Sequence, residues 1–315
     1  MKLTPETITE INKWTGFEDF DGKDIEVVSK DPEIFSDCEV TILMKAIEEG
    51  NLEVVKSLCK AGANVNRVAK GTDQTPLICF EEESKNSTEI AKVLIEYGAD
   101  VNYIRPFDLE DDTFNYLFSS PLMNAIDSGN YERVKLLINS GAEVNACLVE
   151  NGYCAISSLN PEHKDYLEIL KLLIEKNANV NADNSCALKM AIEIGNIKAI
   201  KLLLESGAKP DLCGKNDKTA LMTLLSLMSG YDNDLEDEEE EYLFDLLLSK
   251  TKNINATDSD GKSAIFYAIE SDIGKEDFNI SALFRILEQD IDVNLIDNNG
   301  NNILISRRFK LQVQH

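Results

Sequence analysis

Histidine and cysteine are the side chains of this chain best suited to catalysis or metal binding, and their number and spacing favour neither. The only histidines are His163 and His315. A histidine-based general base would therefore depend on His163, which we expect to be an exposed residue in a loop before a predicted helix. The patterns G-x-G-x-x-G, G-x-x-x-x-G-K and H-E-x-x-H are absent. We predict that the chain is not an enzyme and binds no cofactor.

The seven cysteines contain no C-x-x-C pair, which argues against a zinc site. Cys154 and Cys186 hold the same position in adjacent copies of a repeated pattern, so one repeat should separate them. A disulfide needs a Cα separation of about 4.4–6.8 Å. Only Cys147 and Cys154, which flank one predicted hairpin, could meet. We expect seven free thiols, as is usual in a reducing compartment.

The charge of the chain favours a protein partner with a basic surface. The sequence has 57 acidic and 31 basic residues, a formal net charge of −26. Nucleic acids and anionic membranes are excluded as partners because they are bound through Lys and Arg. The first residues lack the apolar segment of a secretory signal, and no run of roughly 20 apolar residues could span a bilayer. These features predict a cytoplasmic protein that is monomeric on its own.

Two short sequence motifs alternate along the chain and mark the beginning and the end of each copy of a repeat. The first opens each copy at the residues Thr41, Thr75, Ser120, Cys154, Cys186, Thr219 and Ser263. The second closes each copy and reads GANVN at 62–66, GADVN at 98–102, GAEVN at 141–145, NANVN at 177–181, GAKPD at 207–211, NINA near 255 and DIDVN ending at 294. We number the copies as repeats one to seven from these openers.

Each repeat predicts a pair of helices on local grounds. Thr or Ser at the opener is a helix N-cap, and proline follows it at the first helical position in Thr75–Pro76 and Ser120–Pro121. A Gly-Asn break, as at Gly50–Asn51, ends the first helix. Apolar residues at helical spacing then form a second helix. This helix ends at a glycine that can adopt a left-handed conformation, and in repeat four Asn177 replaces the glycine.

The T-P-L-x-x-A opening and the G-A-x-V-N close resemble the ankyrin repeat. The resemblance covers roughly 37–304, as seven repeats and a truncated terminal one. It implies an all-α fold, an ankyrin-repeat solenoid of stacked helix-turn-helix units with hairpin-like connecting loops. Residues 1–36 match nothing and are expected to form an N-terminal capping segment. The array at 37–315 should carry insertions near 81–87, 106–119, 231–242 and 271–280 and a C-terminal cap.

Acidic residues recur seven positions after the openers, at the end of the first helix. They are Glu48, Glu82, Asp127, Glu193 and Glu270, and Glu49 and Glu83 extend two of these positions. The resemblance implies that this position faces the concave groove of the stack, which would make the groove acidic. Lysines share a second phase, early in the second helix, that the family places towards the outer face: Lys56, Lys92, Lys135, Lys171 and Lys201.

Two insertions extend the candidate binding surface. The first, from Tyr103 to Ser119 between repeats two and three, carries residues of the types that are enriched in interface hot spots, namely Tyr103, Arg105, Phe107 and Tyr116. Tyr153 follows on the next loop. These aromatic side chains could instead pack on the neighbouring repeat. The second, at 231–242, has eight acids in residues 232–241; such a run is normally disordered, and it could bind a partner or only solubilise the protein.

The sequence therefore predicts a protein-protein interaction module that binds a basic partner through an acidic concave face. One alternative is an immunity- or antitoxin-like inhibitor that masks a cationic toxin or nuclease. A second alternative is a host-directed effector scaffold, which rests only on analogy within the family.

Overall fold

The computed structural model describes residues 2–14, 17, 20–26, 28–30, 39–80, 86–105, 120–147, 154–212, 218–228, 237–271 and 278–303. Over these residues the regular elements are helices, apart from one two-stranded antiparallel sheet and an isolated bridge between Ile296 and Asn302. The predicted all-α repeat fold is confirmed. The chain divides into two compact units, residues 1–148 with 158–176 and residues 149–157 with 177–315, and each is described by itself.

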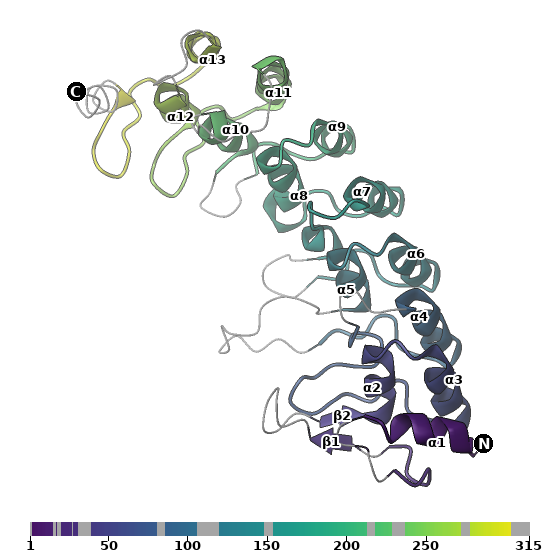
Figure 1. Cartoon of the computed structure of the whole chain (residues 1–315). Helices are drawn as coiled ribbons and strands as arrows, with labels where there is room; N and C mark the ends of the chain where they lie inside the picture. Colours follow the sequence, from purple (N-terminus) through teal and green to yellow (C-terminus); the bar gives the residue numbers. More distant parts are fainter. Residues whose placement is uncertain are drawn as a thin grey trace. The chain divides into compact units, whose positions relative to one another are not determined.

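The first unit holds two layers of helices that belong to repeats one to four (Figure 1). The first layer contains α2 (Ile42–Glu48) and α5 (Pro121–Asp127). In the second layer α3 (Leu52–Ala61), α4 (Ser87–Glu96), α6 (Tyr131–Asn139) and α7 (Tyr166–Glu175) contact one another in that order. Before them come α1 (Pro5–Ile11), β1 (Val28–Lys30) and β2 (Glu39–Thr41), with Val28 opposite Thr41 in the sheet.

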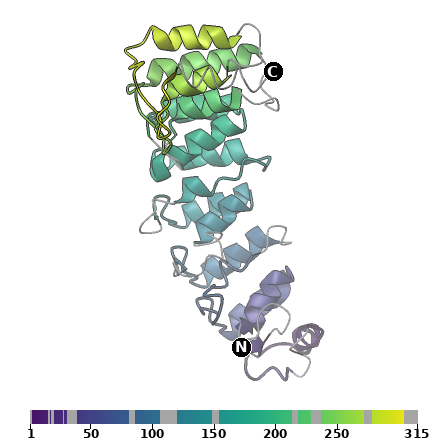
Figure 2. The same ribbon diagram turned by 90° about the vertical axis from the view of Figure 1, so that its left-hand side faces the viewer.

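The second unit repeats this arrangement with repeats five to seven (Figure 1), and Figure 2 shows its helices stacked one above another. One layer consists of α8 (Ala182–Glu193), α10 (Ala220–Met228) and α12 (Ala264–Ser271), in which α10 contacts both neighbours. The other layer consists of α9 (Ile197–Glu205), α11 (Asp237–Lys250) and α13 (Phe278–Leu287). A short 3-10 helix, η1 (Ala155–Ser158), stands at the opener of repeat four in place of an α-helix.

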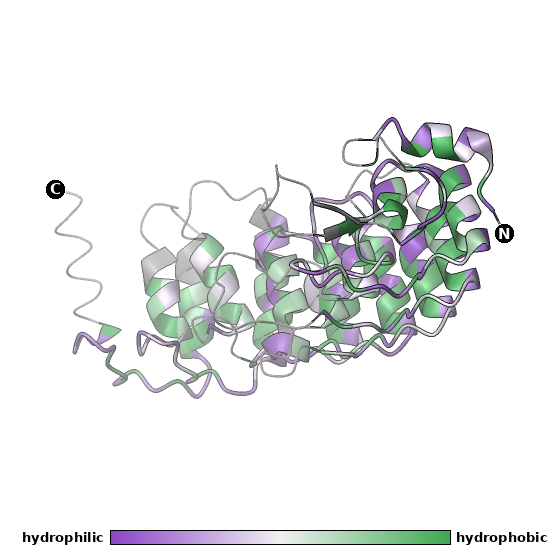
Figure 3. Ribbon diagram, turned by 90° about the horizontal axis from the view of Figure 1, so that it is seen from below, coloured by the Kyte–Doolittle hydropathy of each residue, from purple (hydrophilic) through white to green (hydrophobic). Residues whose placement is uncertain are grey.

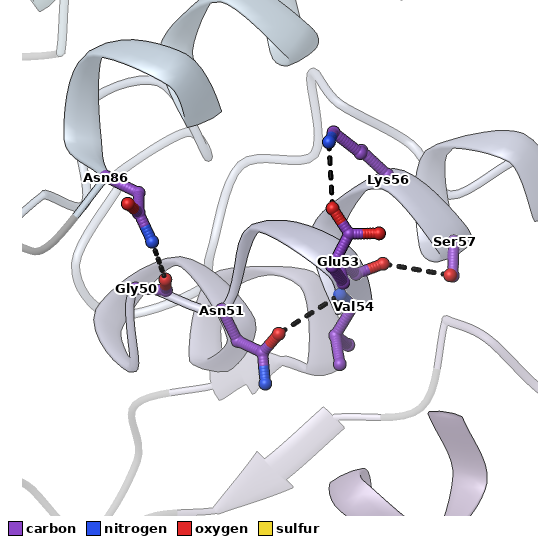
Figure 4. Close-up of polar contacts among 7 residues, drawn as sticks. All are labelled: Gly50, Asn51, Glu53, Val54, Lys56, Ser57 and Asn86. Atoms are coloured by element: carbon purple, nitrogen blue, oxygen red, sulfur yellow. Dashed lines mark hydrogen bonds and ion pairs between the residues drawn. The ribbon is translucent and has the colours of Figure 1, made fainter. Parts of the chain in front are cut away.

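The helix ends form as the local sequence predicts. The Ser120 hydroxyl accepts a hydrogen bond from the Met123 backbone N–H, and Pro121 follows as the first helical residue. At the Gly-Asn break Gly50 has φ +61°, and the Asn51 side chain accepts from the Val54 N–H at 3.2 Å (Figure 4). A left-handed residue that ends one helix and an amide side chain that begins the next fold the pair into a hairpin.

The end of the second helix requires a residue with positive φ. Gly62 has φ +100°, and no atom stands within 4 Å of the place where a Cβ would be. Backbone conformation, not lack of space, therefore selects glycine there. In repeat four Asn177 has φ +62°, which confirms the predicted substitution.

The core of each unit lies between its two layers of helices, and the helices turn their polar faces outward (Figure 3). In the first unit Ile47 and Leu58 are fully buried. A charged residue is buried with them. Arg133, 2% exposed, lies over the Phe80 ring at 4.8 Å and donates to the Asn124 side-chain oxygen at 2.8 Å. Burial lowers the pKa of this guanidinium to about 10, so it remains charged at neutral pH.

Asparagine side chains join successive repeats at the base of the connecting loops. Asn102 donates to the Gly141 carbonyl at 3.0 Å and accepts from the Glu143 N–H at 2.8 Å. The same pair of bonds recurs at three other positions, with Asn66 on Gly98 and Asp100, Asn181 on Gly207 and Lys209, and Asn255 on Asp290 and Asp292. We call these the asparagine bridges.

The N-terminal segment packs against the first repeat. Ile11, Trp14, Phe17 and Phe20 are buried, and α1 contacts α3. The Glu26 carboxylate accepts from the Asn64 N–H at 2.8 Å and lies 3.5 Å from Arg67. Glu26 thus satisfies a backbone N–H at the loop base of repeat one, as an asparagine bridge does in later repeats. The proposal that residues 1–36 cap the array is consistent with these contacts.

Three sequence expectations about local structure are wrong. Thr75–Pro76 opens only a turn, in which the Ile78 N–H bonds to the Thr75 carbonyl. The acidic run at 231–242 is helical from Asp237 onward, where its residues form the first turns of α11. His163 is only half-exposed, because its ring packs on Gly129 and its Nε2 bonds to the Asp127 carbonyl at 2.7 Å.

The core position of Leu137 yields a stability prediction. Its side chain is 1% exposed within α6, so Leu137→Ala should lower the free energy of unfolding by about 2–5 kcal/mol, measured by urea titration. Lys135→Ala on the exposed side of the same helix is the control and should change it by less than about 0.5 kcal/mol. Similar losses for both variants would contradict the assigned helix faces.

The asparagine bridges yield a second stability prediction. Asn102→Ala removes two hydrogen bonds between repeats two and three, and should lower the free energy of unfolding by about 1–3 kcal/mol. Asn139→Ala, an exposed residue on α6, is the matched control and should have little effect. If both variants unfold at the same urea concentration as the unchanged protein, the bridges do not stabilise the stack.

Candidate functional site

A cleft of about 420 Å³ lies between α8 and α10, the first helices of repeats five and six, and all its lining residues belong to the second unit. The α8 wall presents Asp183, Cys186, Lys189, Met190 and Glu193, and the α10 wall presents Thr223, Ser226 and Leu227 with Lys218 just before them. From Cys186 onward the α8 residues Lys189, Met190 and Glu193 recur at helical spacing, which places them on one helix face, and Asp183 lies just before this regular part of the helix.

The cleft has charged walls and an apolar strip. Glu193 is exposed, and no described residue forms an ion pair with its carboxylate. Lys218 is engaged by the protein itself, because its amino group lies 4.7 Å from the centre of the Tyr267 ring and 3.4 Å from the Ser226 hydroxyl oxygen. Half-buried Met190 and Leu227 supply the apolar surface.

The loop that leads into the cleft is unusually short. The connection from Asn66 to Thr75 spans nine positions, whereas that from Asn181 to Cys186 spans five. Asp183, Asn184 and Ser185 all have left-handed backbone, with φ of +46°, +52° and +59°. Consecutive left-handed residues other than glycine are strained. The chain therefore reaches α8 without the projecting loop that precedes repeat two.

Cys186 is a half-buried thiol within this cleft. Burial raises its pKa, and the nearby carboxylates of Asp183 and Glu193 raise it further, while the Lys189 ammonium opposes them by lowering it. The thiolate is therefore scarce at neutral pH. The other described cysteines, Cys59, Cys79, Cys147 and Cys154, also carry thiols, not disulfides.

The predicted acidic positions differ in their surroundings. Glu48 and Glu49 both lie 3.3 Å from the Lys45 ammonium, so this repeat neutralises part of its own charge. Asp127 is half-buried beside the Ser128–Gly129 turn. Glu193 is on the rim of the cleft. The predicted residues Glu82 and Glu83 lie outside the described residues, as does the side chain of Glu270.

The predicted aromatic cluster is described only at its beginning. Tyr103 is half-buried, and its hydroxyl donates to the Asp73 carbonyl of the preceding loop at 3.0 Å. Burial raises the pKa of this phenol, and Asp73 raises it further. Arg105 is half-exposed nearby. Tyr103 therefore packs back on the neighbouring loop, while Phe107, Tyr116 and Tyr153 lie outside the described residues.

Three of the lysines on the second helices have contacts close by. Lys56 bonds to Glu53 (Figure 4), and Lys171 bonds to Glu168, both at 2.8 Å. Lys201 of α9 lies 4.3 Å from the centre of the Tyr242 ring of α11. Such pairs at exposed positions contribute little to stability.

The helical part of the acidic run joins α11 to α13. Arg285 of α13 forms ion pairs with Asp245 and Glu241 of α11 and lies over the Phe244 ring. Glu240 is fully buried. This half of the run therefore packs within the second unit.

The sequence did not single out most of the cleft. Of its lining residues only Glu193 was predicted as a binding residue. The short spacing between Asn181 and Cys186 was the available signal, since it departs from the other repeats. The described residues contain no group of His, Cys, Asp and Glu side chains that could hold a metal ion. No helix in the described part of the chain is long and apolar enough to cross a membrane.

The family model "Ankyrin repeats (3 copies)" matches residues 22–105, 43–147, 122–212 and 153–237, which together exceed half of the chain. The chain belongs to the ankyrin-repeat family. Its helix pairs, left-handed glycines and asparagine bridges are therefore those of ankyrin repeats, a generic type of protein-protein interaction module.

Similar ankyrin-repeat proteins include R598 of Acanthamoeba polyphaga mimivirus, 28% identical over 54% of this chain and 53% of that protein. FPV034 of fowlpox virus is 24% identical over 56% of this chain and 37% of that protein. The chain thus spans about half or less of the length of these relatives. Among solved structures, the human ASB11 ankyrin repeat domain has a TM-score of 0.53 and 24% identity, and it covers 77% of this chain and 96% of its own.

The reactivity of Cys186 tests the electrostatics of the cleft. Because Asp183 helps to raise the pKa of this thiol, Asp183→Asn should lower that pKa and increase the thiolate fraction at pH 8. Alkylation of Cys186 by iodoacetamide, followed by peptide mass spectrometry, should become faster. The rate at Cys147 is the internal control and should stay constant. A slower or unchanged rate at Cys186 would contradict the described surroundings of this thiol.

Proposed function

We propose that this ankyrin-repeat chain binds, as a monomer, a partner protein with a basic surface, and that acidic side chains at the ends of the first helices attract it. The observation that carries the proposal is Glu193, an exposed carboxylate on the rim of the α8–α10 cleft with no ion-pair partner among the described residues. The net charge of −26 supports it, because such a field favours encounter with cations. The chain acts by binding alone, without catalysis.

Exposed acids at this position contribute mainly to the rate of association. Ion pairs at a rim are screened by salt over a Debye length of about 8 Å at physiological ionic strength, so they add little to final affinity. Steering by their summed field can raise association rates by about 10–10³-fold. Buried contacts elsewhere in the interface would then set the dissociation rate.

The experiment begins with a pull-down from the native source, followed by identification of the captured protein. Its association rate is then measured against ionic strength for the unchanged chain and for Glu49→Lys with Glu193→Lys. This variant should associate about tenfold more slowly at low salt and show a flatter salt dependence. The control, Glu96→Lys with Glu205→Lys, makes the same charge change on the exposed second helices α4 and α9.

The two variants separate a localised binding face from a general effect of charge. The proposal requires the first variant to slow association clearly more than the control. Equal slowing by both variants would show that only total charge matters. Association that is indifferent to salt in the unchanged chain would contradict electrostatic steering altogether.

Two specific roles follow from the same surface. In the first, the chain masks a cationic toxin or nuclease as an immunity- or antitoxin-like inhibitor, which the acidity of the chain favours. In the second, it is a host-directed scaffold, which the similarity to ankyrin-repeat proteins of mimivirus and fowlpox virus favours. Loss of the captured protein's enzymatic activity when the chain is added distinguishes the first role from the second.

A further inference from the structure

The α8–α10 cleft is large enough to hold one long side chain. Its volume of about 420 Å³ lies in the range of binding pockets that hold small ligands. Cys186 and Glu193 are seven positions apart on α8, which corresponds to about 10 Å along the helix axis. The α8 wall of the cleft therefore extends for about 10 Å between these two residues.

The cleft is lined by two carboxylates and two ammonium groups, and Glu193 is the only one of these four residues that is exposed. Lys218 is already held by the Tyr267 ring and the Ser226 hydroxyl. Lys189 also has an interaction within the chain. Glu193, in contrast, projects into solvent at one end of the cleft, and Asp183 stands at the other end beside Cys186. A cation that approaches from solvent therefore meets the exposed Glu193 carboxylate, while Lys218 is held on the α10 side by Tyr267 and Ser226.

The middle of the cleft is apolar. Met190 of α8 and Leu227 of α10 face it from opposite walls, and Met190 lies one helical turn from Glu193. Lysine and arginine bury their aliphatic stems along apolar surface and keep the charged group at its edge. Methionine adapts well to such a stem because it is flexible and unbranched. The order of apolar strip and carboxylate matches this kind of side chain.

The short connection before α8 gives access to this surface. Repeat two is preceded by a loop of nine positions, in which Ala69 and Gln74 pair through their backbones at 2.8 Å. Only five positions separate Asn181 from Cys186, so the chain builds no comparable hairpin at Asp183. The connection from Asn181 to Cys186 therefore does not cover the Asp183 end of the cleft.

We propose that the α8–α10 cleft receives a lysine or arginine side chain of the partner protein, with its stem on Met190 and Leu227 and its charged group at Glu193. This inference rests on the proposed function, since it assigns one contact of the same basic partner. It goes beyond that function because it names a pocket, an occupant and an orientation that the general attraction of charges does not require.

Cys186 allows the cleft to be tested without knowledge of the partner. The chain of 315 residues is equilibrated, under mild reducing conditions, with disulfide reagents that carry a guanidinium, a carboxylate or a hydroxyl on the same six-carbon stem. The Cys186 thiolate attacks the reagent disulfide, a mixed disulfide forms, and one equivalent of reagent thiol leaves. Mass spectrometry gives the occupancy at Cys186 and, as an internal reference, at Cys147.

The guanidinium reagent should exceed the carboxylate reagent at Cys186 by about three- to tenfold, as expected for one or two exposed ion pairs. At Cys147 the ratio reports only the general attraction of an acidic protein. Glu193→Gln should bring the Cys186 ratio close to the Cys147 ratio, whereas the matched variant Glu205→Gln on α9 should leave it unchanged. Taking ratios within one variant removes any change in the reactivity of the thiol itself.

A second pair of variants tests the stem. Met190→Ala should lower occupancy by all three reagents about equally while it preserves their ratio, because it removes apolar surface and no charge. Equal ratios at Cys186 and Cys147 in the unchanged chain, or a ratio that survives Glu193→Gln, would overturn the assignment. A cation preference at Cys186 in a chain whose partner proves indifferent to salt would retain the cleft and reject the proposed steering function.

Discussion

The asparagine bridges are the interaction on which the rest of the structure depends. Each bridge uses one amide side chain to satisfy a carbonyl and an N–H of the following repeat, as Asn102 does with Gly141 and Glu143. The groups are those that a helix end and a loop leave without backbone partners. A bridge therefore fixes the spacing of adjacent repeats at the base of their loops. The helices then pack against a neighbour whose position is already set. In repeat five Asp211 holds this place, and its carboxylate accepts from the Lys252 and Asn253 N–H groups but has no amide hydrogen to donate to a carbonyl.

The parts of the fold that could be predicted are those encoded by adjacent residues. A cap such as Ser120–Pro121 and a left-handed end such as Asn177 are local, so the sequence alone indicates them. Interactions between repeats were not accessible in this way. Nothing near Arg133 in the sequence shows that Phe80 covers it, and nothing near His163 shows that it packs on Gly129. The helical start of α11 at Asp237 was missed because a run of acids suggests disorder, although acids are favourable in the first turn of a helix.

For the candidate site, too, the sequence predicts where a residue lies within its repeat but not which residues surround it. Repeat phase identified Glu48 and Glu193 as equivalent positions, but phase carries no information on neighbours. Lys45 lies three and four positions before Glu48 and Glu49, a spacing at which helix pairs interact, so this neutralisation was within reach of the sequence. The α8–α10 cleft was not, because it needs the facing residues of two repeats and the length of the loop between Asn181 and Cys186 together.

That short loop has a consequence for the dynamics of the second unit. Asp183, Asn184 and Ser185 hold a left-handed backbone at a cost of about 1–2 kcal/mol for each residue, less where Asn and Asp are concerned. In a stack of repeats each repeat contacts only its neighbours, so backbone strain in one repeat destabilises mainly that repeat. The first turn of α8 should therefore open more often than the helices around it, and its amide hydrogens should exchange early. A ligand that occupies the adjoining cleft would stabilise the closed form of this turn, so slower exchange at the start of α8 would report a ligand whose charged group lies two helical turns away at Glu193.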